Sequence, residues 1–160
     1  MNIEIVSGYD RTDDVVPMLE EYTQLLLDGD PLFKEYLDLQ RFDDEIEDIS
    51  VKYGEPRGRF LVAYIDGEAA GCVALRELDE ENCEMKRLYV RPKFRGVRLG
   101  SLLVDRIIDE ARAIGYDAIL LDTLPFLKTA IKMYERRGFY FIDSYNNSPM
   151  DTSIFMKMDL

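Results

Sequence analysis

The chain has 160 residues, 47% of them hydrophobic and 32% charged, which suits a single domain spanning the whole chain around a sizeable core. It contains no histidine, which excludes a Ser-His-Asp triad, a Cys-His pair and a His-ligated zinc site. The net charge of −12 lies in residues 1–50, which hold 15 acidic and 3 basic side chains, so we expect no binding to nucleic acid.

The chain also lacks the signals of export or membrane insertion. No apolar run approaches the roughly 20 residues that a membrane span needs. Residues 1–5 lack the basic and apolar parts of a signal peptide, so we expect a cytoplasmic protein. Two cysteines, Cys72 and Cys83, are too few for a metal site or a disulfide framework, and we interpret them as buried thiols.

The first third of the chain predicts one short strand followed by helices. Residues 3–6 suit a strand, and Thr12 begins a helix whose apolar residues recur at helical spacing. The sequence Asp-Gly-Asp-Pro at 28–31 ends this helix and starts a second one. A third, acidic helical piece begins at Phe42, and a loop follows over residues 53–58. The predicted core-facing residues are Val15, Leu19, Tyr22 and Leu26 in the first helix and Leu32, Phe33, Tyr36 and Leu37 in the second.

The rest of the chain alternates strands and helices. Residues 60–65 and 69–78 form a hairpin around Asp66-Gly67, and a third strand begins at Cys83. A helix follows the basic loop and ends at Gly115, and residues 118–121 form a buried strand. Another helix runs from Pro125 to Gly138, before a final strand pair at 139–142 and 154–158. The predicted order is therefore β-α-α-β-β-β-α-β-α-β-β.

The stretch from residue 85 to residue 104 is the most informative part of the chain. It contains six basic side chains and no acidic one. A strand over 85–90 is stopped by Pro92, and Arg95-Gly96-Val97-Arg98-Leu99-Gly100 then leads into a helix. Free amides and the positive end of the helix dipole attract phosphate, so this loop predicts a phosphate or pyrophosphate site. The alternative is a solvated basic turn. The loop matches neither a Walker sequence nor a dinucleotide fingerprint.

Two segments resemble the GNAT superfamily of N-acetyltransferases. The loop resembles the family's acetyl-CoA loop, whose core pattern is [RQ]-x-x-G-x-[GA]; Arg95 and Gly100 match, but Arg98 replaces the middle glycine. The segment Ala130-x3-Tyr134-x3-Gly138-Phe139 is also family-like, although Leu127 stands where many members have asparagine. The resemblance covers almost the whole chain and implies an α/β fold with a mixed, mostly antiparallel sheet of about seven strands flanked by helices.

The resemblance implies acetyl-CoA as co-substrate, without a metal, and transfer of its acetyl group to an amine of a small molecule or peptide. The Val90 N–H is expected to polarise the thioester carbonyl. If position 98 requires a positive φ, Arg98 costs about 1–2 kcal/mol or narrows the pocket; otherwise its guanidinium adds a phosphate contact. The expected cofactor-binding residues are Leu88, Tyr89, Val90, Arg95, Gly96, Val97, Arg98, Leu99, Gly100 and Ser101.

Two residues are candidates for proton transfer. Glu84 lies four and six residues before Leu88 and Val90, so strict alternation predicts that all three share one face of the strand. Some family members use a glutamate there as general base; the alternative is an ion pair with Lys86 or Arg87. Tyr134 matches the tyrosine that protonates the coenzyme A sulfur in many members. The alternative is a half-buried core tyrosine.

Other features leave alternatives open. Tyr145, Asn146 and Asn147, or Glu45 and Asp48, are candidates to line the acceptor pocket, or are merely solvated. The acidic residues 1–50 either attract a cationic acceptor or only increase solubility, and the helices at 12–50 are also a candidate homodimer surface. The departures at positions 98 and 127 motivate a second function, a coenzyme A-binding module or sensor without turnover.

Overall fold

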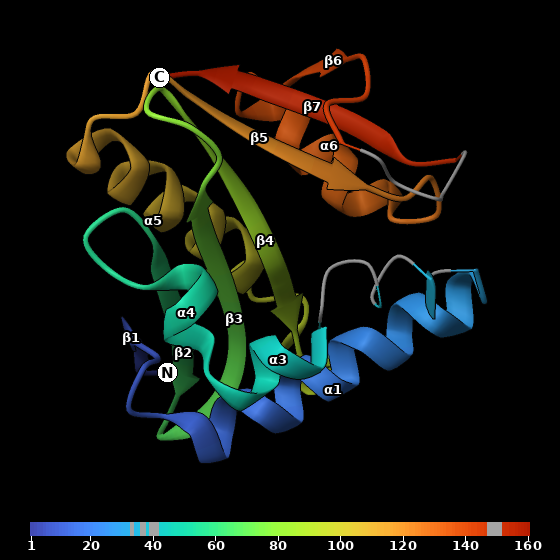
Figure 1. Ribbon diagram of the computed structural model, residues 1–160. Helices are drawn as coiled ribbons and strands as arrows, with labels where there is room; N and C mark the ends of the chain where they lie inside the picture. Colours follow the sequence, from blue (N-terminus) through green and yellow to red (C-terminus); the bar gives the residue numbers. More distant parts are fainter. Residues whose placement is uncertain (33, 36–37, 39–41, 147–151) are drawn as a thin grey trace.

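In the computed structural model, which describes residues 1–32, 34–35, 38, 42–146 and 152–160, seven strands form one sheet of order β1-β2-β3-β4-β5-β7-β6 (Figure 1). Only β4 and β5 pair in parallel, and the other neighbours are antiparallel. This confirms the predicted mixed, mostly antiparallel sheet. The strands are β1 (Ile3–Ser7), β2 (Arg59–Ile65), β3 (Glu68–Glu77), β4 (Asn82–Val90), β5 (Ala118–Thr123), β6 (Tyr140–Ile142) and β7 (Ile154–Asp159).

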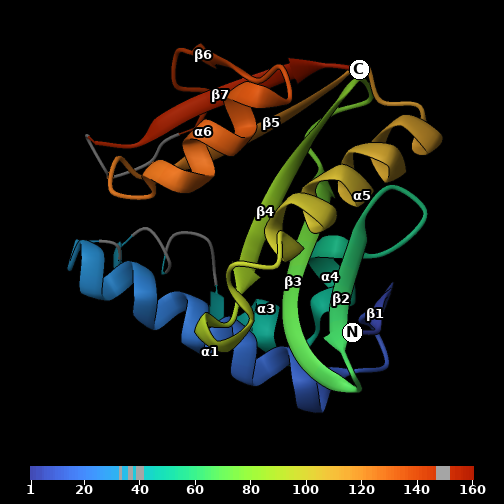
Figure 2. The same ribbon diagram turned by 180° about the vertical axis from the view of Figure 1, so that it is seen from behind.

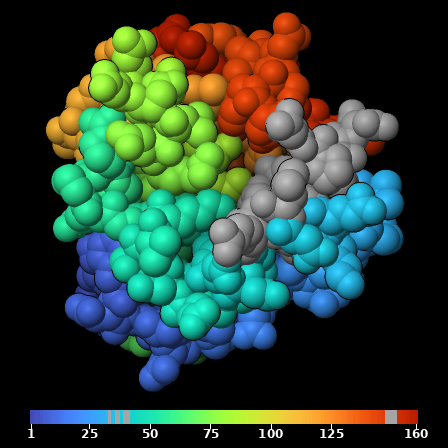
Figure 3. All heavy atoms as spheres, in the orientation of Figure 1, coloured from blue at the N-terminus to red at the C-terminus, as the bar shows by residue number. Residues whose placement is uncertain are grey.

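Helices cover both faces of this sheet. Figures 1 and 2 show α1, α3 and α4 on one face and α5 and α6 on the other. In the space-filling view, the turquoise α3–α4 segment lies between the blue start of α1 and the yellow-green turn that joins β3 to β4 (Figure 3). The helices are α1 (Thr12–Gly29), α3 (Phe42–Glu47), α4 (Ile49–Tyr53), α5 (Leu99–Ile114) and α6 (Lys128–Arg136), and a short 3-10 helix, η1, spans Pro92–Phe94.

Each face has its own hydrophobic core. Leu103 and Ile107 of α5 pack with Val73 and Met85 on one face. Residues of α1 pack with Phe60 and Tyr89 on the other. The helical spacing in the sequence correctly predicts the buried positions Val15, Leu19 and Leu26 of α1. Among the described residues, none of the helices combines the length and apolar character that a membrane crossing requires.

Several predicted boundaries are confirmed, and one helix was missed. The helix from Thr12 ends at Gly29, and Asp66 and Gly67 have φ values of 49° and 83°, as a tight hairpin turn requires. Helix α4 was not predicted as a separate element. It begins after Asp48, whose carboxylate accepts the Ser50 N–H at 3.0 Å and so caps the helix. Leu32, which was predicted to face the core from the second helix, is 63% exposed, so that prediction is wrong. Phe33, Tyr36 and Leu37 of the predicted second helix lie outside the described residues.

A β-bulge interrupts β4 at Arg87. The pairing of β3 with β4 shifts between Cys72 and Ala74, and Arg87 has a φ of 59°, the left-handed region that non-glycine residues seldom adopt. The bulge inserts one residue into the alternation of the strand. Two residues that lie on either side of the bulge, an even number of positions apart in the sequence, therefore face opposite sides of the sheet.

The prediction that Glu84 shares a face with Leu88 and Val90 is consequently wrong. Cys83 and Met85 belong to the core beneath α5, and Leu88 and Val90 pack against that same core. Glu84 alternates with Cys83 and Met85, so its side chain lies on the α1 face. The spacing argument assumed a regular strand, and the bulge breaks that assumption.

A buried ion pair holds the bulged residue. The Arg87 guanidinium, 2% exposed, donates from Nε to Glu45 Oε2 at 2.7 Å and from a terminal nitrogen to Oε1 at 2.9 Å. Lys52 Nζ of α4 lies 3.2 Å from the same carboxylate. Burial raises the pKa of Glu45, but the charges and hydrogen bonds of Arg87 and Lys52 together outweigh it and lower this pKa to about 2. The pair therefore ties α3 and α4 to the middle of β4.

The Glu45–Arg87 pair predicts a specific acid sensitivity. Because the Glu45 pKa falls from 4.5 to about 2 on folding, its contribution of about 3 kcal/mol is complete above pH 4.5 and is lost as the pH falls towards 2. The wild type and Glu45→Gln should therefore differ most in their unfolding free energy near neutral pH. In acid, this difference should become smaller by about 3 kcal/mol. Urea titrations from pH 2 to pH 7 measure this.

Glu47→Gln is the matched control, because Glu47 is exposed on the same short helix. It should change the unfolding free energy by less than about 0.5 kcal/mol at each pH. A Glu45→Gln difference that stays constant across the pH range would contradict the assigned pair.

Candidate active site

Strands β4 and β5 separate where the candidate site begins. They pair only from Asn82 with Ala118 to Glu84 with Leu120, and then diverge (Figures 1 and 2). Beyond Glu84, the edge of β4 that faces β5 therefore no longer pairs with β5. A strand edge of this kind presents backbone N–H and C=O groups to a ligand.

Val90 directs its peptide groups to this open edge. The Arg91 N–H donates to the Ala70 carbonyl at 2.9 Å, so the next pair, Val90 with Gly71, occupies a non-hydrogen-bonded position. The Val90 N–H and C=O therefore point away from β3. The carbonyl accepts a hydrogen bond from Arg95 Nε at 3.2 Å. This geometry agrees with the role expected for the Val90 N–H.

The loop after β4 presents free amides at the start of α5. The N–H groups of residues 96–101 donate to no backbone or side-chain acceptor in the described part of the chain, and the first residue of α5 has no side-chain cap. Gly96 and Arg98 both adopt positive φ, 91° and 61°. Arg95, Gly96 and Arg98 are exposed to solvent. The site is basic and has unsatisfied donors, so it fits a diphosphate.

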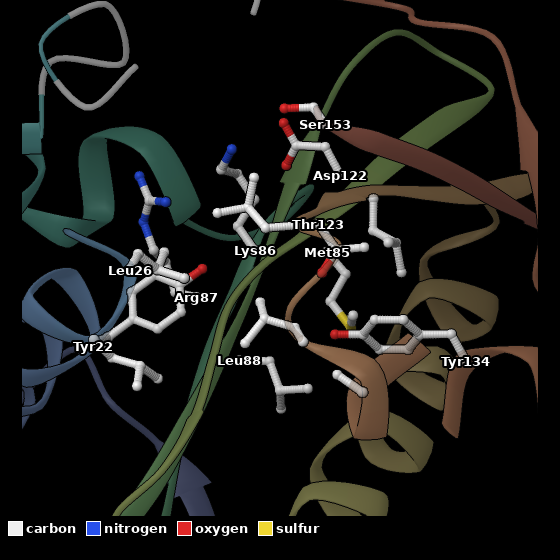
Figure 4. Close-up of a pocket in the computed structure, with 15 residues that line it drawn as sticks. Tyr22, Leu26, Met85, Lys86, Arg87, Leu88, Asp122, Thr123, Tyr134 and Ser153 are labelled. Carbon is white, nitrogen blue, oxygen red and sulfur yellow. The ribbon is translucent and has the colours of Figure 1, made fainter. Parts of the chain in front are cut away.

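A cavity of about 100 Å³ lies where β4 and β5 diverge (Figure 4). It reaches from α1 on one face of the sheet to α6 on the other. Its size suits a small reacting group rather than a whole substrate. The lining residues include Tyr22, Met85, Lys86, Arg87, Leu88, Asp122, Thr123, Leu127, Ala130, Tyr134 and Ser153.

Tyr134 faces this cavity from α6. The residue is 5% exposed, and its ring packs on Phe139 with centroids 5.6 Å apart. Its hydroxyl has no hydrogen-bond partner among the described residues and points into the cavity (Figure 4). Burial raises the pKa of Tyr134 far above its usual value, so the hydroxyl remains a proton donor. Tyr134 is therefore both a core tyrosine and a lining residue.

Glu84 occupies a different environment. Its carboxylate is 2% exposed, accepts from Arg76 Nε at 2.8 Å and from the Tyr145 hydroxyl at 2.5 Å, and lies 3.7 Å from Lys86 Nζ. It is not among the residues that line the cavity. The expected ion pair with Lys86 is present, and Arg76 is a closer partner that the sequence did not suggest.

The remaining predicted site residues divide into two groups. Leu88 lines the cavity, whereas the Tyr89 side chain lies on the α1 face and its hydroxyl donates to Glu21 at 3.2 Å. Only the backbone of Tyr89 therefore lies along the open edge. Asn146 Nδ2 donates to Asp122 at 3.2 Å, which brings the late loop to the cavity. Neither Glu45 nor Asp48 lines the cavity, and Asn147 lies outside the described residues.

The sequence reasoning missed several polar lining residues, among them Lys86, Asp122 and Ser153. Lys86 gave no signal, since a lysine in a strand is usually solvated. Asp122 did give one, because it directly follows the apolar run at 118–121 and so ends a buried strand with a carboxylate. Such strand ends frequently carry functional side chains.

The positive φ of Arg98 predicts stored strain. Arg98→Gly should raise the free energy of unfolding by about 0.5–1 kcal/mol, because glycine adopts this conformation without steric cost. Chemical denaturation measures the change. Arg98→Lys keeps a side chain at the same φ and should leave stability within about 0.5 kcal/mol of the wild type. An equal gain in both variants would exclude backbone strain as its cause.

Comparison with known proteins agrees with this geometry. The family model described as Acetyltransferase (GNAT) family matches residues 19–139. The chain is 39% identical to an uncharacterised N-acetyltransferase of Schizosaccharomyces pombe, over 92% of this chain and 88% of that protein.

Solved structures extend the likeness to the fold. An acetyltransferase from Streptococcus agalactiae has a TM-score of 0.78 and 27% identity, covering 99% of this chain and 98% of the other. PaiA N-acetyltransferase from Thermoplasma acidophilum, crystallised with coenzyme A, has a TM-score of 0.76 over the whole of both chains, and at 17% identity it supports the fold alone. The family match and the S. pombe relative establish the family, and the chain belongs to the GNAT acetyltransferases.

Proposed function

We propose that the protein transfers an acetyl group from acetyl-CoA to a primary amine by direct attack within a ternary complex. The observation that carries this proposal is the continuity of three features. The free amides at 96–101 lead to the open edge of β4, and that edge leads to the cavity lined by Tyr134. Together they form one path for a diphosphate, an extended arm and a thioester.

The chain's own groups are suited to hold this co-substrate. We assign the diphosphate to the free amides of residues 96–101, next to the exposed side chain of Arg95. The open edge at Leu88 and Val90 pairs with the amide-containing arm, and the Val90 N–H polarises the thioester carbonyl. Acetyl-CoA supplies the activated acetyl group.

Two protons must be managed during transfer. The ammonium of the acceptor loses one proton to a carboxylate, and its neutral nitrogen then bonds to the acetyl carbon as the bond from that carbon to sulfur breaks. The nitrogen loses its second proton as the amide forms, and the departing thiolate takes up one proton. Tyr134 donates a hydrogen bond to the departing thiolate. Because its pKa lies above the ~8.5 of a thiol, Tyr134 stabilises the thiolate chiefly through this bond. The role of Glu84 as general base stays a prediction, as do a cytoplasmic location and a homodimer.

A second function is favoured by two departures from the family pattern. Arg98 has the positive φ that a glycine would adopt freely, and Leu127 both precedes α6 and lines the cavity. These residues motivate a coenzyme A-binding module or sensor with little turnover.

The acceptor of the proposed enzyme is an amine of a small molecule or peptide.

Turnover distinguishes the two functions. Free thiol is measured after mixing acetyl-CoA with polyamines, amino acids, aminoglycosides and peptides, each paired with a control lacking protein. Acceptor-dependent thiol release above that control supports the transferase. Tight coenzyme A binding by calorimetry without any such release would support the sensor.

Loss of the Tyr134 hydroxyl should slow transfer without loosening the cofactor. Tyr134→Phe removes one hydrogen bond to a charged group, so we expect kcat to fall by about 10–100-fold. The dissociation constant of coenzyme A should stay within about threefold of the wild type. Tyr140→Phe, at an exposed tyrosine on β6, is the control. An unchanged kcat in Tyr134→Phe would reject the role of Tyr134.

A further inference from the structure

Two carboxylates lie on the α1 face of the sheet near the end of the β4–β5 pairing, Glu84 and Asp122. We propose that Asp122 is the group that receives the ammonium of the acceptor and takes its proton. This inference rests on the proposed acetyl transfer and deepens it, because it names the carboxylate that holds the acceptor amine.

Asp122 lies where β5 begins to separate from β4. Leu120 is the last residue of β5 that pairs with β4, and Asp122 follows it by two. Ile119 and Leu121 belong to the core beneath α5, so Asp122 faces the opposite, α1 side. Tyr134 enters the same cavity from the α5–α6 side. A thioester in the cavity therefore has Tyr134 on its sulfur side and Asp122 where a nucleophile approaches.

Access separates Asp122 from Glu84. Asp122 lines the cavity and is partly exposed, and Figure 4 shows its carboxylate among the polar side chains there. Glu84 is 2% exposed, does not line the cavity and accepts from both Arg76 and Tyr145. An incoming amine meets Asp122 first. Asp122 accepts from Asn146 Nδ2 at 3.2 Å and is a counter-charge for Lys86. Glu84 is a counter-charge for both Arg76 and Lys86.

The charges around the cavity are arranged to favour this role. Lys86 and Arg87 of β4 also line the cavity. Glu45 forms the bidentate pair with Arg87, and Lys86 has two counter-charges, Asp122 and Glu84, of which Glu84 lies 3.7 Å away. Burial raises the pKa of both Tyr22 and Tyr134, and the charge of Asp122 raises both further. At Tyr22 the charge of Arg87 opposes this effect and lowers the pKa. A cation placed between those tyrosines is stabilised by Asp122.

The proton step balances without another reactant. Asp122 accepts one proton from the ammonium, leaving a neutral amine whose nitrogen bonds to the acetyl carbon as the carbon–sulfur bond breaks. The nitrogen then loses its second proton as the amide forms, and the thiolate, held by Tyr134, takes up one proton. The net products are the acetylated amine, free thiol and one proton, which leaves Asp122 for solvent.

The test uses two coenzyme A thioethers and needs no known acceptor. S-(2-aminoethyl)-coenzyme A carries an ammonium one atom farther from sulfur than the attacking nitrogen, and S-propyl-coenzyme A has the same length without charge. Calorimetry at pH 7 gives both dissociation constants. The wild type should bind the ammonium compound more tightly by about tenfold or more.

The variants assign that preference to one carboxylate. Asp122→Asn should bring the ratio of the two constants to about one, and Asp122→Glu should retain a preference because it keeps the charge. Glu84→Gln should keep the ratio, as should Asp109→Asn, a control at an exposed acid on α5. Binding of the propyl compound within about threefold of the wild type shows that each variant has a folded cofactor site.

Three results would overturn the assignment. A wild type that binds both compounds equally rejects it directly. A preference that survives in Asp122→Asn, or that disappears in Glu84→Gln alone, moves the role away from Asp122. If the wild type binds neither compound nor coenzyme A itself, the proposed function fails and this inference fails with it.

Discussion

The site depends on the bulge that Arg87 makes in β4. A non-glycine residue at a φ of 59° inside a strand is strained, and it persists only when its surroundings hold it there. Glu45 of α3 fixes Arg87 by accepting two short, buried hydrogen bonds from its guanidinium. The bulge turns Leu88 and Val90 towards the α5 side and leaves Glu84 on the other. Without the bulge, regular alternation would place Leu88 and Val90 on the same side of the sheet as Glu84.

The cavity where β4 separates from β5 is a passage lined from both faces of the sheet. The basic loop and Tyr134 lie on the α5–α6 side of this passage, and Tyr22 and Asp122 lie towards α1. In acyl transfer the nucleophile and the leaving group need different proton partners. In the proposed reaction these partners come from two different elements, Tyr134 from α6 and Asp122 from β5.

Much of the fold follows from local sequence signals, and part of the site does not. Periodicity gave the buried face of α1, and Asp66-Gly67 gave the hairpin, because these signals depend on neighbouring residues alone. The bulge at Arg87 depends on Glu45, 42 residues earlier, so no local pattern reveals it. The error about the face of Glu84 follows from that one missed residue. Asp122 did give a local signal, a carboxylate at the end of a buried strand, but its position at the cavity follows only from the placement of β5 beside β4.

The central claim is that the open edge of β4 and the amides after it bind acetyl-CoA. A crystal structure with coenzyme A bound tests it most directly. The account predicts a diphosphate within hydrogen-bond distance of the amides at 96–101, with the extended arm paired to β4 at Leu88 and Val90. Coenzyme A bound at another surface, or excluded from the cleft by the Arg98 side chain, would contradict it.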